Sequence, residues 1–344
     1  MTPPLARIGI AGLGRMGRRH AQNLAHRVQR AKLVAACSPV ADELAWARAA
    51  LGVADIYTEY AQMLGHPDLD AVFLVTPTTL HAGQIIAALG AGKHVFSEKP
   101  LALNLADCLR VEAEAARHPR LKVMIGYVRR FDASYRAAHD KIAAGAIGRP
   151  FLVHSQTADR NDPGGFFVRF APTSGGILLD MSVHDIDAAR WLLGAAGATR
   201  VYATGTIAIH EGLAACDDVD NAVATIEFEG GQIATLYASR TMAHGHETAT
   251  EIVGTAGRLT VGRNPSLDRV EIADAHGVRN ECTPTFYERF AEAFLCEAQA
   301  FVDIVADDRA PPVTLRDATE ATRIGIAVTE SLRTKRIVEL DRVS

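Results

Sequence analysis

The sequence predicts an α/β domain built on a parallel sheet, followed by an α+β domain with a large, mostly antiparallel and open sheet. A length of 344 residues suits about two domains. Before residue 127, apolar strands alternate with helical stretches, as in a parallel sheet covered by helices on both faces. After it, several strands alternate apolar with polar residues, as half-exposed antiparallel strands do. The domains are therefore expected at 1–126 and 127–344.

The first domain is expected to alternate strands and helices throughout. Its strands are predicted at 7–11, 32–37, 71–76, 93–96 and 122–127. Its helices are predicted at 14–28, 40–51, 78–89 and 105–117. Asn104 suits an N-cap, with Asp107 three positions later to complete a relative of the capping box. Such a sheet binds its ligands at the carboxyl ends of its strands.

The second domain is expected to be rich in strands. They are predicted at 151–158, 201–209, 222–228, 232–239, 251–253 and 270–272. The Glu229-Gly230-Gly231 segment indicates a hairpin between two of them. A long helix at 284–306 carries an apolar stripe that we interpret as core: Phe286, Phe290, Phe294, Phe301 and Val305. A last helix is predicted at 315–334, and it could pack against the first domain.

Composition excludes several classes of protein. The net charge is −4, and this mild acidity argues against a nucleic-acid binder. No apolar run approaches 18 residues without a charge, so no membrane span is expected. The five cysteines are widely spaced and form no CxxC pair, which argues against a disulfide framework and a zinc cage. We therefore expect a cytoplasmic protein with reduced thiols and no metal site.

A glycine motif opens the chain. Gly12, Leu13, Gly14, Arg15, Met16 and Gly17 spell G-x-G-x-x-G between a strand and a helix, which is the context that the motif requires. The first glycine allows a tight turn, the second lets the backbone approach a pyrophosphate, and the third lets helix and strand pack closely. The segment predicts a Rossmann dinucleotide site. The alternative is a glycine-rich turn without a ligand.

The end of the second strand bears on the choice of cofactor. NAD sites usually place Asp or Glu there for the ribose 2′-hydroxyl, and NADP sites place Arg nearby for the 2′-phosphate. This chain instead has Ser38, whose hydroxyl could bind a ribose, and Pro39, which could pack on adenine. No Lys or Arg follows until Arg48, and Arg15 is the other nearby cation. The absence of a phosphate clamp favours NAD and leaves NADP as the alternative.

Two further segments follow strands and are expected at the same edge of the sheet. Thr76 and Pro77 begin a T-P-x-x-x-H segment that ends at His81. Glu98 and Lys99 begin the E-K-P segment. A lysine at this edge can stabilise a developing alkoxide. The alternative is a solvated surface lysine.

An acid and a histidine stand four residues apart in the second half of the chain. Asp180 and His184 share one helical face if the segment is helical. Histidine suits general-base work near neutral pH, and a carboxylate can orient it. The competing interpretations are a metal ligand and a structural core histidine.

Together these motifs resemble the Gfo/Idh/MocA oxidoreductase family along almost the whole chain. They include Gly12–Gly17, Thr76–His81 and Glu98-Lys99-Pro100. The resemblance continues through Gly126–Asp132, Gly175-Gly176, Asp180–Asp187, Asp220-Asn221-Ala222 and Gly254-Thr255-x-Gly257. Gly126–Asp132 and Arg160–Pro163 are similar to the inositol dehydrogenases of that family.

The resemblance implies a set of residue roles. Lys99, Asp180 and His184 would be catalytic, and a cis bond before Pro100 would aim Lys99. Binding of the cofactor would extend to Thr76, Pro77, His81, Glu98, Lys99 and Arg129. Substrate would contact Lys99, Arg129, Asn161, Asp180 and His184. Arg169 is a further substrate candidate, with an ordinary surface arginine as the alternative.

The implied reaction is NAD-dependent oxidation of a ring hydroxyl of scyllo- or myo-inositol to the ketone, or of a pyranose such as glucose to its lactone. The implied assembly is a dimer or tetramer formed through the open sheet face. Ser38 departs from the acidic ribose ligand of NAD-dependent relatives, which keeps an NADP-dependent aldose dehydrogenase open. A non-catalytic nucleotide or sugar sensor is the alternative from another class.

Overall fold

The computed structural model describes residues 5–195 and 197–341. The chain divides into two compact units. The first comprises Met1–Val128 and Glu292–Thr322, and the second comprises Arg129–Ala291 and Arg323–Ser344. The first unit thus takes in a segment from near the end of the chain.

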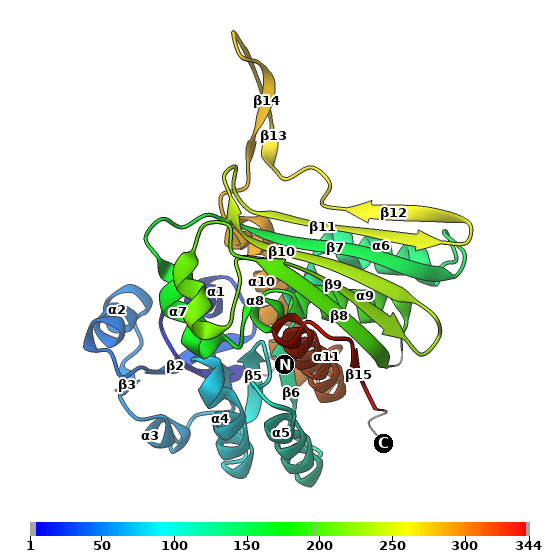
Figure 1. Ribbon diagram of the computed structural model, residues 1–344. Helices are drawn as coiled ribbons and strands as arrows, with labels where there is room; N and C mark the ends of the chain where they lie inside the picture. Colours follow the sequence, from blue (N-terminus) through cyan, green and yellow to red (C-terminus); the bar gives the residue numbers. More distant parts are fainter. Residues whose placement is uncertain (1–4, 196, 342–344) are drawn as a thin grey trace. The chain divides into compact units, whose positions relative to one another are not determined.

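The first unit is built on a six-stranded parallel sheet, in the order β3-β2-β1-β4-β5-β6 (Figure 1). The strands are β1 (Ala6–Ala11), β2 (Ala31–Cys37), β3 (Asp55–Tyr57), β4 (Ala71–Leu74), β5 (His94–Glu98) and β6 (Val123–Gly126). β4 and β6 are buried along their whole length, as strands covered on both faces are. The predicted parallel α/β fold is confirmed.

The helices of this unit are α1 (Arg15–His26), α2 (Ala41–Leu51), α3 (Tyr60–Leu64), α4 (Thr78–Gly90) and α5 (Leu105–Arg117). The predicted cap is present, since the Asn104 side chain accepts a 2.8 Å hydrogen bond from the Asp107 N–H. β3 and α3 were not predicted. Both are short, and the three residues of β3 are exposed or half-buried, so neither produces a clear periodic pattern.

The second unit contains a seven-stranded sheet, in the order β12-β11-β7-β10-β9-β8-β15. The strands are β7 (Pro150–Arg160), β8 (Ala198–Thr206), β9 (Asn221–Phe228), β10 (Ile233–Met242), β11 (Glu247–Gly254), β12 (Gly257–Val261) and β15 (Val338–Glu339). All neighbours are antiparallel except β7 and β10, which are parallel. The largely antiparallel sheet and the hairpin between β9 and β10 agree with prediction, and β12 and β15 were missed.

Helices cover one face of this sheet. They include α6 (Ala133–Ala143) and α9 (Val183–Leu193), which lie behind the strands in Figure 1. Tyr202, Val223 and Ile233, on three neighbouring strands, are 39–47% exposed. The remaining elements before β9 are η1 (Val128–Phe131), α7 (Phe166–Ser174), α8 (Ile177–Asp180) and η2 (Glu211–Cys216).

A two-stranded arm projects from the second unit (Figure 1). It is formed by β13 (Ser266–Asp274) and β14 (Gly277–Cys282), which pair with each other. The prediction at 270–272 found the centre of β13 and missed β14. Both strands are almost wholly exposed, so neither has the buried face that makes a strand visible in a sequence.

Two long helices follow the arm in the chain, α10 (Phe286–Ala306) and α11 (Leu315–Thr334), and only β15 comes after them among the described elements. α11 matches its predicted range, whereas α10 is interrupted at Phe290, whose backbone is not helical. Phe290, Phe294 and Phe301 are buried as predicted, and Phe286 and Val305 are only half-buried. Among the described residues, no helix combines the length and the apolarity needed to cross a bilayer.

Candidate active site

The glycine motif forms a tight strand-to-helix turn. Gly12 has φ +87°, and a Cβ there would lie 2.3 Å from the Val75 carbonyl oxygen. A Cβ at Gly17 would lie 2.0 Å from the Gly12 carbonyl oxygen. Around Gly14 the nearest atom to such a Cβ is 3.9 Å away. The first and third glycines are therefore needed for packing, while the second leaves an open cradle at the start of α1 that fits a dinucleotide pyrophosphate.

A carboxylate that the sequence analysis did not consider lies beside this cradle. Glu43, in the first turn of α2, accepts a 2.5 Å hydrogen bond from the Ser38 hydroxyl. Its other oxygen, Oε1, is the atom 3.9 Å from the Cβ position of Gly14. Ser38 itself is buried. The end of β2 therefore does carry an acidic group, supplied from five residues further on.

His81 joins two of the predicted cofactor loops. It is 1% exposed, and its ring nitrogens lie 2.9 Å from the carbonyl oxygens of Thr76 and Pro100. Burial, as the largest influence, lowers the pKa of His81, against the hydrogen bonds that raise it. The imidazole of His81 therefore connects the loop after β4 to the loop after β5 through hydrogen bonds to one carbonyl oxygen of each.

Lys99 follows the last residue of β5 and is half-buried. Its backbone N–H donates to Oε2 of Glu98, 3.3 Å away. The bond between Lys99 and Pro100 is cis, as the resemblance implied. Lys99 therefore lies at the carboxyl edge of the sheet, beyond the same ends of β1 and β4 that carry the other cofactor segments.

Asp180 and His184 do not share one continuous helix, so the condition for a common helical face is not met. Asp180 is the last residue of α8, and His184 is the second residue of α9. Met181 and Ser182 separate the two helices. Gly176, with φ +96°, stands at the N-cap of α8 and marks where that short helix begins.

Asp180 and His184 also differ from their neighbours in their exposure to solvent. Between residues 176 and 190, Asp180 and His184 are half-buried, and every other residue is buried. A core histidine would be buried with its neighbours. His184 instead opens to solvent at the start of an otherwise buried helix, as a group that must meet a substrate does.

Arg240 of β10 is a functional candidate that the sequence analysis missed. It is 0% exposed and lies 3.2 Å from both Asp180 and Asp218. Asp218 also accepts a 2.9 Å hydrogen bond from the backbone N–H of Ile177, at the start of α8. The arginine therefore holds the Asp180 carboxylate against a fixed frame. The available signal was that Arg240 is the only charged residue of β10.

Two ion pairs anchor α9. Arg129 donates to Asp185 at 2.6 Å, and Arg130 donates to Asp187 at 2.9 and 2.6 Å. Arg129 and Asp185 are 2% and 0% exposed. Burial disfavours the charge of Arg129, but Asp185 and Tyr135 together outweigh burial and raise its pKa. Arg129 is assigned above to cofactor and substrate. In the structure its guanidinium pairs with Asp185 and so positions the helix that carries His184.

The two remaining substrate candidates differ. The side-chain oxygen of Asn161 is shielded from solvent, and no described group donates to it. Arg169 is exposed and donates to the Gly164 carbonyl oxygen at 2.6 Å, which tightens the turn before α7. Asn161 therefore retains an acceptor for a ligand hydroxyl, whereas Arg169 has a local partner.

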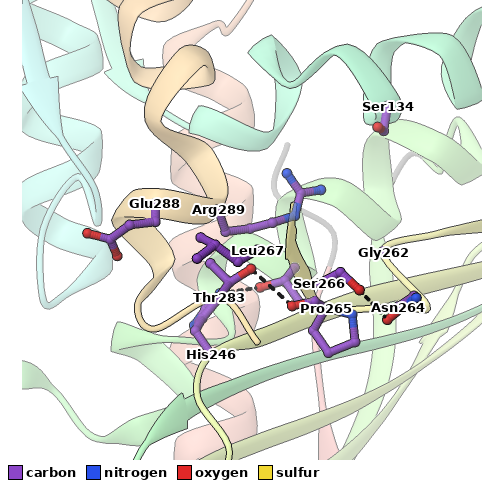
Figure 2. Close-up of a pocket in the computed structure, with 11 residues that line it drawn as sticks. Ser134, His246, Gly262, Asn264, Pro265, Ser266, Leu267, Thr283, Glu288 and Arg289 are labelled. Atoms are coloured by element: carbon purple, nitrogen blue, oxygen red, sulfur yellow. Dashed lines mark hydrogen bonds between the residues drawn. The ribbon is translucent and has the colours of Figure 1, made fainter. Parts of the chain in front are cut away.

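A polar cavity of about 380 Å³ lies elsewhere in the second unit. It opens at the base of the arm, between residues that include Asn264, Pro265, Leu267 and Arg289 (Figure 2). His246 contributes to its wall and is held between Asp159 and Thr248, at 2.9 and 2.7 Å. None of the predicted site residues lines this cavity, which is therefore distinct from the candidate active site.

Comparison with known families agrees with this geometry. The model of an oxidoreductase family with an NAD-binding Rossmann fold, GFO/IDH/MocA, matches residues 6–127. The model of the GFO/IDH/MocA C-terminal domain matches residues 135–260. The two matches fall on the parallel sheet and on the larger mixed sheet.

Individual relatives extend over nearly the whole chain. The scyllo-inositol 2-dehydrogenase (NAD⁺) of Bacillus subtilis is 37% identical over 335 residues, 97% of this chain and 96% of its own. The myo-inositol 2-dehydrogenase of Thermotoga maritima is 33% identical over 98% of this chain and 99% of its own. The crystal structure of scyllo-inositol dehydrogenase from Lactobacillus casei, with bound NAD(H) and scyllo-inositol, has a TM-score of 0.94 and 39% identity. It matches 97% of this chain and 99% of that one. The chain therefore belongs to the GFO/IDH/MocA family of oxidoreductases.

Proposed function

We propose that this protein oxidises a ring hydroxyl of an inositol, scyllo- or myo-inositol, to the ketone with NAD. The observation that carries the proposal is the pair Asp180 and His184, which alone reach solvent along an otherwise buried stretch. Inositol dehydrogenases that resemble the chain from end to end support the substrate class.

The cofactor would be held by the cradle at Gly14 and by Glu43. The N–H groups at the start of α1 face that cradle and suit a pyrophosphate. The Glu43 carboxylate would accept hydrogen bonds from the adenosine ribose and repel a 2′-phosphate. Bound NAD supplies the hydride acceptor.

The chemical step would rest on three side chains of this chain. His184 takes the proton from the hydroxyl that becomes the carbonyl. Asp180, held by Arg240, orients the imidazole and stabilises its protonated form. Lys99 stabilises the negative charge that grows on the same oxygen. Asn161 would accept a hydrogen bond from another hydroxyl of the ring, which favours a polyol over a simple alcohol.

A substrate panel at fixed NAD tests this proposal. We expect inositol stereoisomers to give the highest kcat/KM and pyranoses such as glucose to come next. The physical reason is that a ring with hydroxyls all round leaves no polar group of the site unpaired. Asn161→Leu should lower kcat/KM for inositol more than for a simple cyclic alcohol, which has no hydroxyl to lose. Strong turnover of open-chain hydroxy acids, with none of inositol, would refute the assignment.

We also propose that the chain assembles as a dimer or tetramer through the open face of its seven-stranded sheet. Tyr202, Val223 and Ile233 expose apolar surface on three neighbouring strands, an apolar patch suited to contact. We expect Val223→Glu to lower the mass measured by light scattering, with Val278→Glu on the arm as the matched control. An unchanged mass for Val223→Glu would place the interface elsewhere.

A further inference from the structure

Three titratable side chains meet inside the first unit: His20 of α1, Glu98 of β5 and Glu297 of α10. One ligand-type atom from each lies within 4.8 Å of the others. His20 is 1% exposed and Glu297 is 0% exposed. The rings of Phe96 and Phe294 lie 5.6 and 5.7 Å from that of His20, so the surroundings are apolar. The reaction described above uses none of these three side chains directly.

Glu98 has the surroundings of an ionised carboxylate. Its Oε1 lies 2.7 Å from Nε2 of His20, which donates to it. Its Oε2 accepts from the backbone N–H of Lys99. Burial raises the pKa of Glu98, but the hydrogen bond from His20 and the charges nearby, Lys99 included, outweigh burial and hold that pKa below its ordinary value.

Glu297 has the opposite surroundings. Neither of its carboxyl oxygens has a hydrogen-bond partner among the described residues. A Cβ at Gly126 would lie 3.5 Å from Oε1 of Glu297 and 3.5 Å from Oε2 of Glu98, so the two carboxyls approach each other at this glycine. Burial, followed by the charge of Glu98, raises the pKa of Glu297 well above 4.5. Two such groups cannot both ionise in an apolar site.

We propose that Glu98, whose side chain is 13% exposed, and the buried Glu297 form a pair that holds one proton, carried by Glu297, and so keeps a single negative charge beside Lys99. Glu297 is then a positioning residue that acts through Glu98 on the loop that presents the lysine. Glu98 precedes the Lys99-Pro100 segment and Glu297 belongs to α10, while His20 connects Glu98 to α1. Its effect on turnover rests on the proposed function, whereas its protonation state does not.

Among the described residues, His81 of α4 also feels the charge of Glu98, which raises the pKa of the histidine against burial. It is held between two backbone carbonyls, and burial lowers its pKa. His20, Lys99 and His81 therefore all interact electrostatically with the Glu98 member of the pair. The net charge around Glu98 and Glu297 depends on how many protons the two carboxyls hold. The number of protons is therefore the quantity to measure.

Infrared difference spectroscopy counts that proton directly. In the spectrum of the wild type minus Glu297→Gln at pH 7, we expect the carbonyl stretch of a protonated carboxyl. The matched control is Glu292→Gln on the same helix, whose side chain is 76% exposed and should yield only carboxylate bands. A carboxylate band for Glu297 would overturn the proposal, whatever the enzyme oxidises.

Unfolding provides a second measurement without turnover. An acid whose pKa is raised in the folded state loses more protons on unfolding, so its contribution to stability falls as pH rises above the unfolded value of 4.5. The Tm of Glu297→Gln minus that of the wild type should therefore increase with pH through that range. A difference that does not change with pH would mean that Glu297 ionises equally in both states, and would contradict the pair.

Turnover distinguishes a shared charge from a purely structural role. Glu297→Gln keeps the neutral form and should retain most of the kcat. Glu98→Gln should lower kcat at least about tenfold, the effect of one lost hydrogen bond to a charged group. The double variant should be worse than Glu98→Gln, because Glu297 can supply the charge only while it can ionise. Equal kcat values for Glu98→Gln and the double variant would refute the sharing.

A bound cation would also neutralise two carboxylates, and metal analysis separates the two cases. We expect no stoichiometric metal in the purified wild type. A metal that is present in the wild type and lost in Glu297→Gln, together with no protonated carboxyl band, would overturn the proposal. Failure of the wild type to oxidise any inositol would instead reject the proposed function and leave the infrared result standing.

Discussion

Replacing His184 by Ala is expected to lower kcat by about 10²–10⁴-fold, the usual range for a lost general base. The half-buried position of His184, at the start of a helix buried everywhere else, supports this role. The Kd for NAD should barely change, because the Gly12–Gly17 turn belongs to the first unit and His184 to the second. Steady-state kinetics on inositol and a separate NAD titration measure the two quantities.

The control for this variant is His244→Ala. His244 lies in the same unit, its side chain is 47% exposed, and its partner is Glu247. It should leave kcat and folding unchanged. If His184→Ala folds and turns over inositol like the wild type, the assignment of the base is wrong. If it instead unfolds, a structural role is indicated, and circular dichroism decides between the two.

Local chemistry was predictable from the sequence, and tertiary partners were not. The Gly12–Gly17 turn and the Asn104 cap depend on neighbours within a few residues, so their spacing in the sequence was enough. Arg129, by contrast, faces Asp185, 56 residues away. The ion pair that places Arg129 against the helix carrying His184 therefore could not be predicted from the motif, and its assignment to a ligand stays a prediction.

The same reason explains Asp180. Spacing of four residues suggested a shared helical face, but the helix breaks between the two residues, and Arg240 holds the carboxylate from a strand 60 residues later. The sequence could not show that Asp218 pairs with Arg240 and also accepts the hydrogen bond from the backbone N–H at the start of α8. The motifs of the sequence were therefore enough to propose Asp180 and His184 as candidates. The partners that hold Asp180, Arg240 and Asp218, became visible only in the fold.

The Glu43 carboxylate beside Ser38, proposed above as the ligand of the ribose, leads to the second large expected effect. Glu43→Gln should lower kcat/KM with NAD by about 10- to 100-fold, the cost of a lost hydrogen bond to a charged group. It should also raise kcat/KM with NADP, because the carboxylate that repels a 2′-phosphate is gone. The ratio of the two kcat/KM values is the quantity to measure, and it should move toward NADP.

Asp42→Asn is the matched control, since it removes the same charge from the same first turn of α2 at an exposed position. It changes the field at the helix start as Glu43→Gln does, but it leaves the carboxylate beside Ser38 and Gly14 in place. The cofactor ratio should therefore stay close to that of the wild type. A ratio that moves equally in both variants would show that general charge, rather than a carboxylate at the end of β2, sets the choice between NAD and NADP. The open cradle at Gly14 would then bind either cofactor, and the discrimination would have to come from residues outside this turn.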